Sequence, residues 1–276
     1  MIIILFWRKE ERYYVPIIGN PGVGKTSFIV SMGKLVSDVG WGFPCGSPRE
    51  VAYFYEVLSL VSQGKPIPPT RGFKKIKICI NKVAYRGDVI ETNLLLSSGD
   101  ISGQDYNLAI DWLSVHDVEE VAGAPPVISR FINLIEKADL IIPILDITRS
   151  LNEDDVDLES ALIKEIGRHL YAVATGVEYI CHISRKTIKG VFFVFNKADI
   201  HRLTVKDIRR IFEDVFAILI ARLRHSGIEW RVYTTVSIHW GKNPVETLKS
   251  RGFNKLLYDL VATLSGYTLD TQTNIY

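Results

Sequence analysis

A glycine-rich segment near the amino terminus constrains the fold of this 276-residue chain more than any other feature. Residues Gly19–Thr26 read GNPGVGKT and fit the pattern G-x-x-x-x-G-K-[ST]. The run Tyr13–Ile18 before it predicts a strand, and the apolar periodicity of Lys25–Val36 after it predicts a helix. A loop of this kind turns its backbone N–H groups inward at the amino end of a helix, so it predicts a site for the phosphates of a nucleotide.

Each residue type in this phosphate loop answers a chemical need. We expect Lys25 to bridge the β- and γ-phosphates and the Thr26 hydroxyl to bind Mg²⁺. Pro21 removes one N–H group, but the donors from Gly22 onward remain. A glycine-rich turn that only caps a helix is the alternative. The loop residues expected to contact the nucleotide are Asn20, Pro21, Gly22, Val23, Gly24, Lys25, Thr26 and Ser27.

Strand-like and helix-like runs alternate along the rest of the chain. The predicted strands are Tyr13–Ile18, Lys74–Asn81, Thr92–Ser98, Leu140–Leu145, Val191–Phe195 and Arg231–Ser237. The predicted helices are Lys25–Val36, Arg49–Gln63, Pro126–Lys137, Asp155–Ala174, Thr204–His225 and Val245–Leu264. This alternation predicts an α/β fold with a central, mostly parallel six-stranded sheet, helices on both faces and ligands at the carboxyl ends of the strands.

A second motif follows the predicted strand Thr92–Ser98 and reads D-I-S-G-Q. Asp100 at the end of an apolar strand can bind Mg²⁺, and the N–H of Gly103 can meet a γ-phosphate. Gln104 stands where a side chain can orient an attacking water molecule. An ordinary turn of Asp, Ser and Gly at the end of a strand is the alternative interpretation.

A third motif, N-K-A-D, begins at Asn196 directly after an apolar predicted strand. The carboxylate of Asp199 is our candidate for accepting the two N–H groups that guanine presents and adenine lacks. Lys197 would pack its stem over the purine, and Asn196 would tie this segment to the phosphate loop. After the last predicted strand, a backbone N–H near Ser237 and Ile238 could reach guanine O6. A simple helix cap remains the alternative for N-K-A-D.

In this order, each at the end of a strand, these motifs resemble the GTP-binding domain of Ras-like and translation-factor-like P-loop GTPases. Gly19–Ser27 resembles the P-loop, Asp100–Gln104 the switch II segment, Asn196–Asp199 the N-K-x-D motif and Ser237–Ile238 a degenerate last guanine-binding loop. The resemblance covers about residues 13–265. It implies one GTP-binding domain over residues 1–276, with insertions at about 38–69 and 151–189.

The first switch of that family is the hardest to place in this chain. It should supply a threonine that binds Mg²⁺ and senses the γ-phosphate, and Thr70, just before the strand Lys74–Asn81, is the best candidate. An ordinary proline-rich loop is the alternative. We expect Arg49 and Arg71 to be surface residues rather than an arginine finger, so hydrolysis should be slow without an activating partner.

The resemblance implies a nucleotide-dependent switch that hydrolyses GTP to GDP with Mg²⁺, with Lys25, Thr70 and Gln104 as its catalytic residues. A protein effector or activating protein would be the partner. A guanine-nucleotide-binding scaffold with little catalysis is a second hypothesis, motivated by the uncertain first switch and the two insertions. An ATP-using P-loop kinase or ATPase is a third, and the N-K-A-D motif speaks against it.

The composition of the chain argues against several classes of protein. The formal net charge is only +2, so no strong overall field favours nucleic acid. Three widely spaced cysteines, Cys45, Cys79 and Cys181, fit neither a disulfide framework nor a zinc ribbon, so we expect a cytoplasmic protein. The apolar start Met1–Trp7 is too short to span a bilayer, and we interpret it as an edge strand or docking segment, with peripheral membrane contact as an alternative.

Overall fold

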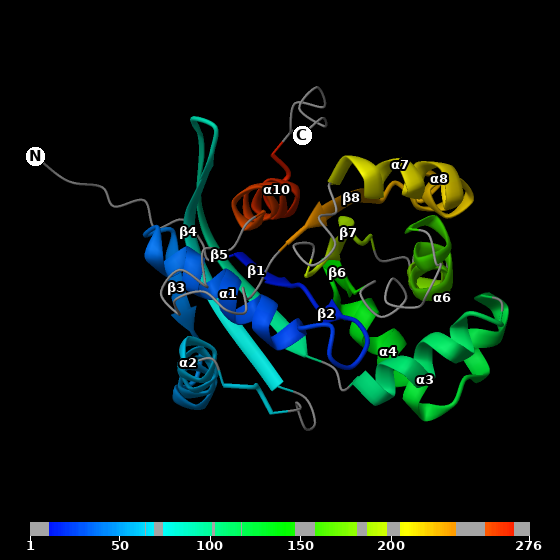
Figure 1. Cartoon of the computed structure of the whole chain (residues 1–276), viewed down its shortest axis with the longest axis horizontal. Helices are drawn as coiled ribbons and strands as arrows, with labels where there is room; N and C mark the ends of the chain where they lie inside the picture. Colours follow the sequence, from blue (N-terminus) through cyan, green and yellow to red (C-terminus); the bar gives the residue numbers. More distant parts are fainter. Residues whose placement is uncertain are drawn as a thin grey trace, which may run out of the picture.

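The computed structural model describes residues 11–63, 65–68, 74–100, 103–116, 118–146, 158–180, 187–197, 205–235 and 252–267. Over these ranges, eight strands form one sheet in the order β3-β4-β5-β2-β6-β7-β8, and β1 also pairs with β5 (Figure 1). The strands are β1 (Glu11–Tyr14), β2 (Ile17–Ile18), β3 (Gly42–Cys45), β4 (Lys74–Tyr85), β5 (Asp88–Asp100), β6 (Leu140–Leu145), β7 (Gly190–Phe195) and β8 (Glu229–Thr234).

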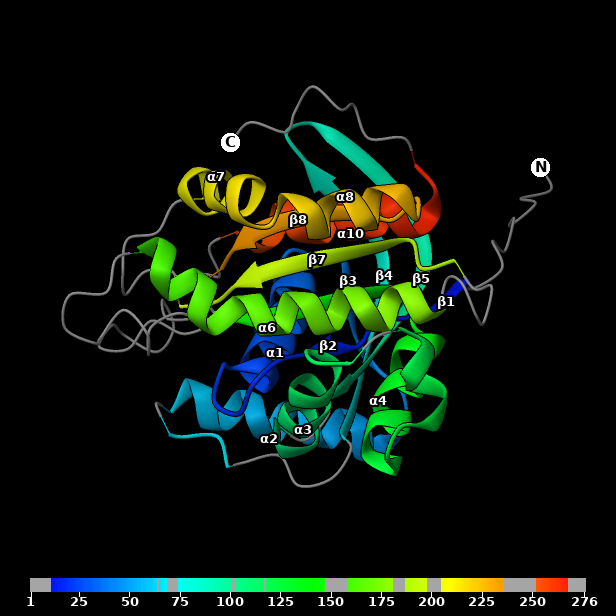
Figure 2. The ribbon, with the colours of Figure 1, turned by 90° about the vertical axis from the view of Figure 1, so that its right-hand side faces the viewer.

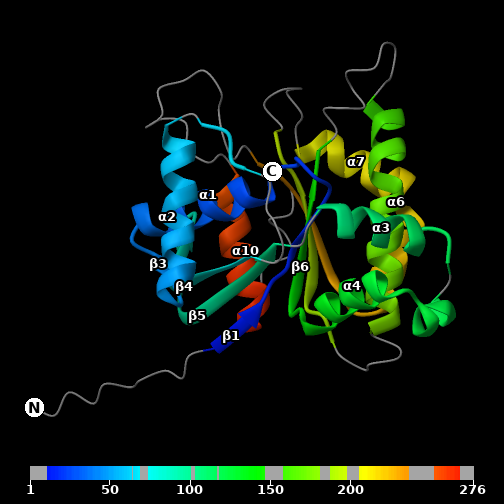
Figure 3. The ribbon, with the colours of Figure 1, turned by 90° about the horizontal axis from the view of Figure 1, so that it is seen from below.

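Helices cover both faces of this sheet, as the alternating pattern predicts (Figure 3). One face carries α1, α2 and α10, and the other carries α3, α4, α6, α7 and α8. In the described part of the chain no helix is both long and apolar enough to cross a membrane. The helices are α1 (Lys25–Asp38), α2 (Pro48–Ser62), α3 (Gly103–Leu113), α4 (Pro126–Lys137), α6 (Leu158–Tyr179), α7 (Val205–Val215), α8 (Ala217–His225) and α10 (Phe253–Ser265), with a 3₁₀ turn η1 (Val118–Gly123).

The expected six-stranded sheet is wrong in its strand count. The predicted first strand is divided at Pro16, which has no N–H group to donate, so β1 pairs with β5 while β2 lies between β5 and β6. Strand β3 was not predicted either, because four residues that include Pro44 give no strand pattern. The sheet is mixed, since β3 and β5 each run antiparallel to β4 and the remaining pairs are parallel.

Besides shifted ends, such as that of α6 at Tyr179 instead of Ala174, the helices differ from the prediction in their number. Helix α3 was not expected: it begins at Gly103, inside the D-I-S-G-Q motif, for which the sequence predicts a Mg²⁺- and water-positioning segment or, alternatively, a turn. The single helix expected over Thr204–His225 is two helices, α7 and α8, which meet at the buried Phe216. The expected strands Lys74–Asn81 and Thr92–Ser98 extend into a long hairpin, whose tip projects beyond the sheet in Figure 1.

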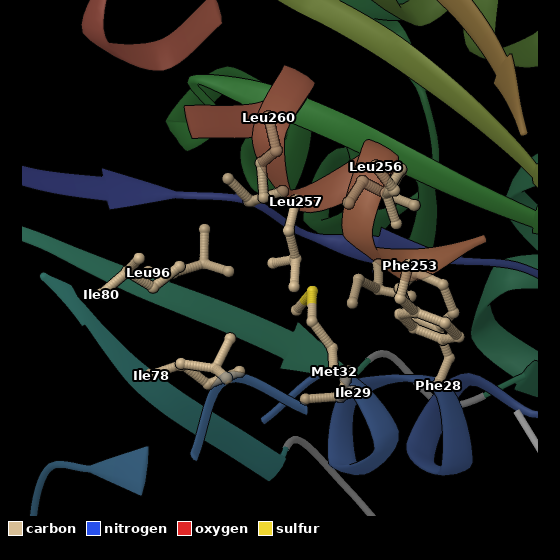
Figure 4. Close-up of a cluster of buried hydrophobic side chains, with 14 of the residues drawn as sticks. Phe28, Ile29, Met32, Ile78, Ile80, Leu96, Phe253, Leu256, Leu257 and Leu260 are labelled. Carbon is tan, nitrogen blue, oxygen red and sulfur yellow. The ribbon is translucent and has the colours of Figure 1, made fainter. Parts of the chain in front are cut away.

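Apolar side chains on alternate sides of the central strands build a core on each face. In β6, Leu140, Ile142 and Ile144 belong to one buried cluster, while Ile141 and Leu145 belong to the other. A strand buried on both faces has no polar alternation, as these residues show. Figure 4 shows the first cluster, where side chains of α1, α10, β4 and β5 meet.

The strand pairing corrects the expectation for the cysteines. Cys45 in β3 and Cys79 in β4 form a disulfide, with a Cα–Cα distance of 5.9 Å. They are 34 residues apart in sequence, and only the antiparallel pairing of β3 with β4 brings them together. Sequence spacing alone therefore did not identify this pair.

Helix α2, in the first predicted insertion, begins with a complete capping box. The Ser47 side chain accepts from the Glu50 N–H, and the Glu50 carboxylate accepts from the Ser47 N–H at 2.7 Å. Lys77 Nζ on β4 lies 3.1 Å from the same carboxylate. Burial raises the pKa of Glu50, but the hydrogen bonds from Ser47 and Lys77 outweigh it, so the pKa is lowered.

Candidate functional site

The phosphate loop connects the end of β2 to the start of α1, as its motif requires. Gly19 has φ +153°, and a Cβ there would lie 2.4 Å from the carbonyl oxygen of Ile144 on β6. Gly24 has φ +90°, a left-handed conformation that L side chains rarely adopt. Both positions therefore need glycine: the first for close approach to the neighbouring strand, the second for the turn into the helix.

Lys25, the first residue of α1, is buried against this loop. Its Nζ donates to the carbonyl oxygens of Gly19 at 2.9 Å and Asn20 at 3.1 Å, so the loop backbone itself places the cation. Gly24, the residue before α1, makes no side-chain cap, and Thr26 and Ser27 follow in the first turn. A helix amino end with a lysine held beside it favours an anion with several oxygens, such as a nucleotide phosphate.

Asn196 joins the N-K-A-D motif to the phosphate loop, as the sequence analysis expected. Its Nδ2 donates to the carbonyl oxygen of Val23 at 3.0 Å, across 173 positions of the chain. The Asn196 N–H donates to Leu145 O at 3.0 Å, and the Thr235 hydroxyl donates to Asn196 Oδ1 at 3.4 Å. The buried Asn196 therefore holds the ends of β6 and β8 and the loop together.

Lys197 lies over the same loop and has a partner that the sequence analysis missed. Its Nζ lies 2.5 Å from Asp146 Oδ2 and donates to Gly22 O at 3.3 Å. Asp146 directly follows β6, and its side chain is buried. A single Asp after an apolar strand carries no motif, so only its position at the carboxyl edge of the sheet could have identified it.

Two of the residues proposed for Mg²⁺ lie near the phosphate loop. Thr26 is in the first turn of α1, and Asp100 is the last residue of β5, paired with Ile17 just before the loop. A hydroxyl and a carboxylate are hard oxygen donors, which suit Mg²⁺ completed by water and phosphate. The donor set therefore fits this ion. Among the described residues no group of three or more His, Cys, Asp or Glu side chains that could hold a metal ion occurs.

Other expected site residues lie wholly or partly outside the described residues. Thr70, Asp199, Ser237 and Ile238 are among them, as is Arg71. Gly103 and Gln104 are described only as the first residues of α3, so their backbone is placed at the start of that helix. Arg49 is exposed at the start of α2, as expected of a surface residue.

No protein-family model and no curated protein matches the sequence. Similar solved structures include the G domain of the T. maritima FeoB iron transporter, with 16% identity, TM-score 0.35 and coverage of 93% of this chain and 99% of that one. An Aquifex aeolicus Era variant bound to GDP and AlF₄⁻ has 16% identity, TM-score 0.39 and coverage of 94% and 58%. The S. cerevisiae Ski7 GTPase-like domain bound to GTP has 12% identity, TM-score 0.43 and coverage of 94% and 51%.

Each of these structures is a G domain, a GTPase-like domain or a protein bound to a guanine nucleotide. The chain spans little more than half of the Era and Ski7 chains. TM-scores below 0.5 and identities of 16% or less establish no shared activity. The function proposed below therefore depends on this chain's own residues.

Proposed function

We propose that this protein binds GTP and GDP through the phosphate loop and the N-K-A-D motif. The observation that carries the proposal is the contact between two motifs distant in sequence, in which Asn196 bonds Val23 O and Lys197 bonds Gly22 O. A nucleotide whose phosphates bind the loop then has its base directed toward the segment after β7. Asp199, the acidic residue of that motif, supplies the acceptor pair that favours guanine over adenine.

We treat the chain as one GTP-binding domain of the Ras-like P-loop type, because one sheet carries every described motif. Elements β3 and α2 then belong to the first insertion, and the whole of α6 belongs to the second. Among the residues that the structure describes, this arrangement leaves no separate domain for another substrate.

We further propose that the protein hydrolyses GTP slowly and acts as a switch. Lys25 and the loop N–H groups hold the phosphates and stabilise charge on the transferring group, while Gln104 orients the attacking water. Thr26, Asp100 and Thr70 would hold Mg²⁺, which supplies charge neutralisation on the phosphates when bound. The ordering of Thr70 and the Asp100–Gln104 segment around the γ-phosphate would distinguish the GTP state from the GDP state.

Nucleotide affinity tests the binding proposal directly. Titration of the purified chain with fluorescent GTP, GDP and ATP analogues, with and without Mg²⁺, should show tight binding of both guanine nucleotides and weak binding of ATP. Equal affinity for ATP, or no binding of GDP, would contradict it. Asn196→Ala should weaken both guanine nucleotides, since it removes the contact that joins the two motifs.

The scaffold hypothesis keeps nucleotide binding and discards catalysis. Two features of the sequence support it: no motif identifies the threonine of the first switch, and two insertions enlarge the domain. Gln104→Leu separates the hypotheses, because a catalyst should lose multiple-turnover phosphate release while a scaffold should release no phosphate above background in either form. GDP affinity, measured in parallel, should be the same for both proteins.

A further inference from the structure

A partly buried polar contact links the second residue of the phosphate loop to helix α6. Asn20 Nδ2 and His169 Nε2 are 2.9 Å apart, although they are 149 positions apart in sequence. His169 is only 5% exposed and lies on the face of the sheet covered by α3, α4 and α6. Figure 2 looks onto this face, with α6 in front of the strands. A helix of the second insertion therefore reaches the loop.

The same imidazole ring also contacts helix α3. The rings of His169 and Tyr106 are stacked, with centroids 5.7 Å apart and an interplanar angle of 2°. Tyr106 is fully buried, and burial raises its pKa well above the ordinary value, so its phenol stays protonated. Because α3 begins at Gly103, Tyr106 lies within one turn of the segment that follows Asp100.

His169 therefore stands between two parts of the candidate site. On one side it bonds the loop through Asn20, and on the other it packs against the helix that begins with Gly103 and Gln104. Burying an imidazole is unfavourable unless its nitrogen atoms are hydrogen-bonded, and Asn20 supplies such a partner to Nε2. Their contact thus fixes both the Asn20 side chain and the ring orientation of His169.

We propose that His169 is a positioning residue, which holds Asn20 of the phosphate loop and couples that loop to α3 through Tyr106. The proposal rests on the proposed nucleotide binding. Phosphates bound in the loop restrain Asn20, and the restraint passes through the imidazole to the buried face of α3. Nucleotide binding should therefore slow amide exchange in α3, and loss of the imidazole should remove that effect.

Three variants separate the two contacts. His169→Phe keeps a ring against Tyr106 but cannot bond Asn20, whereas His169→Gln keeps a bonding group but has no ring. Thr175→Val is the matched control, because this residue is equally buried on the same helix and its hydroxyl has no hydrogen-bond partner among the described residues.

The measurements are the dissociation rate of fluorescent GDP and the hydrogen–deuterium exchange of α3 with and without GDP. His169→Phe should speed dissociation about tenfold, as expected for one lost, partly buried hydrogen bond. His169→Gln should return the dissociation rate most of the way to the slow wild-type value. In this variant, however, GDP should no longer slow hydrogen–deuterium exchange in α3. Asn20→Ala should give the same rate alone as when combined with His169→Phe, because both remove one contact. Thr175→Val should match the wild type.

The outcomes are distinguishable. If the wild type binds no GDP, the proposed function fails and this positioning role fails with it. If the wild type binds GDP but His169→Phe releases it at the wild-type rate, the inference alone is overturned. A His169→Phe protein that melts at a lower temperature but keeps the normal dissociation rate also overturns it, since the residue would then be structural only.

Discussion

Replacing Lys197 by methionine tests whether the buried Asp146 depends on its ammonium group. The Asp146 side chain is 5% exposed and that of Lys197 is 35% exposed. Breaking a fully buried ion pair costs about 3–5 kcal/mol, and breaking an exposed pair costs about 0–1 kcal/mol. With one partner buried and the other partly solvated, we expect Lys197→Met to destabilise the protein by about 2 kcal/mol. Methionine keeps the length of the stem, and both residues meet the same cost at the backbone φ of 61°.

The assay is urea unfolding of nucleotide-free protein, because bound nucleotide adds its own stabilisation. The second mutation, Asp146→Asn, removes the buried charge, so the double variant should be more stable than Lys197→Met alone. The coupling energy of the cycle should be about 2 kcal/mol. In thermal unfolding the single variant should melt roughly 4–8 °C lower. Lys34→Met is the matched control, because Lys34 pairs with the exposed Asp38 and should cost under about 0.5 kcal/mol.

Two results would refute this reasoning. One is a cost of Lys197→Met no greater than that of Lys34→Met, which would mean that water screens the buried carboxylate. The other is an additive cycle, in which the loss of Asp146 gives no relief to the Lys197 variant. Either result would mean that the pair does not hold the segment after β7 against the phosphate loop.

Three further predictions concern the loop and the edge of the sheet. Gly24→Ala should lower the free energy of unfolding by about 2 kcal/mol and weaken GDP binding. Gly40 is also left-handed, but a Cβ there would meet no other atom. Gly40→Ala should therefore cost only about 1 kcal/mol and leave GDP affinity unchanged. Reduction of the Cys45–Cys79 disulfide should lower stability by about 3–4 kcal/mol, and a variant with both cysteines replaced by serine should be insensitive to reductant in the same melting assay. The pKa of Glu50 is lower in the folded protein than its value of 4.5 in the unfolded chain, so the ionised carboxylate stabilises the fold above pH 4.5. Stability should therefore fall as the pH drops below that value. The fall should be less steep in Glu50→Gln when unfolding is followed from about pH 7 to pH 3.

One result would contradict each of these three predictions. A Cβ at Gly24 would lie 2.7 Å from Asn196 Nδ2, so equal stability losses for the two glycine variants would mean that this amide does not constrain Gly24. A melting temperature unchanged by reductant would mean that pairing of β3 with β4 holds the edge without the disulfide. Identical acid profiles for Glu50→Gln and wild type would remove the capping box as a source of acid sensitivity.

The sequence predicts the elements of this fold where a local pattern exists. The glycine spacing before Lys25 identifies the loop, and continuous apolar runs identify the buried strands β6 and β7, since neither depends on distant residues. Strand β3 has no such pattern, and its place comes from pairing with β4. The division of the first predicted strand into β1 and β2 at Pro16 depends on the strands with which each half pairs. That pairing is set by the whole sheet and not by the local sequence.

In the candidate site, too, residues within a sequence motif were predicted and residues outside any motif were not. Asn196 was predicted to tie the two motifs, and the contact with Val23 is present. Asp146 and His169 were not predicted, because each is a single residue with no motif, and each gains its role from a contact with a residue 51 or 149 positions away. Such contacts follow from the sheet order and helix packing, which local patterns do not specify.

The proposed selection of guanine over adenine by Asp199 is tested most directly by competition for bound fluorescent GDP. GDP should displace the probe from the wild type, and ADP should need a concentration at least about a hundredfold higher, because adenine leaves the acceptor pair of Asp199 without donors. In Asp199→Asn, xanthosine diphosphate should replace GDP as the better competitor, since an amide can donate to the xanthine 2-oxygen. Equal competition by ADP and GDP in the wild type would contradict the account.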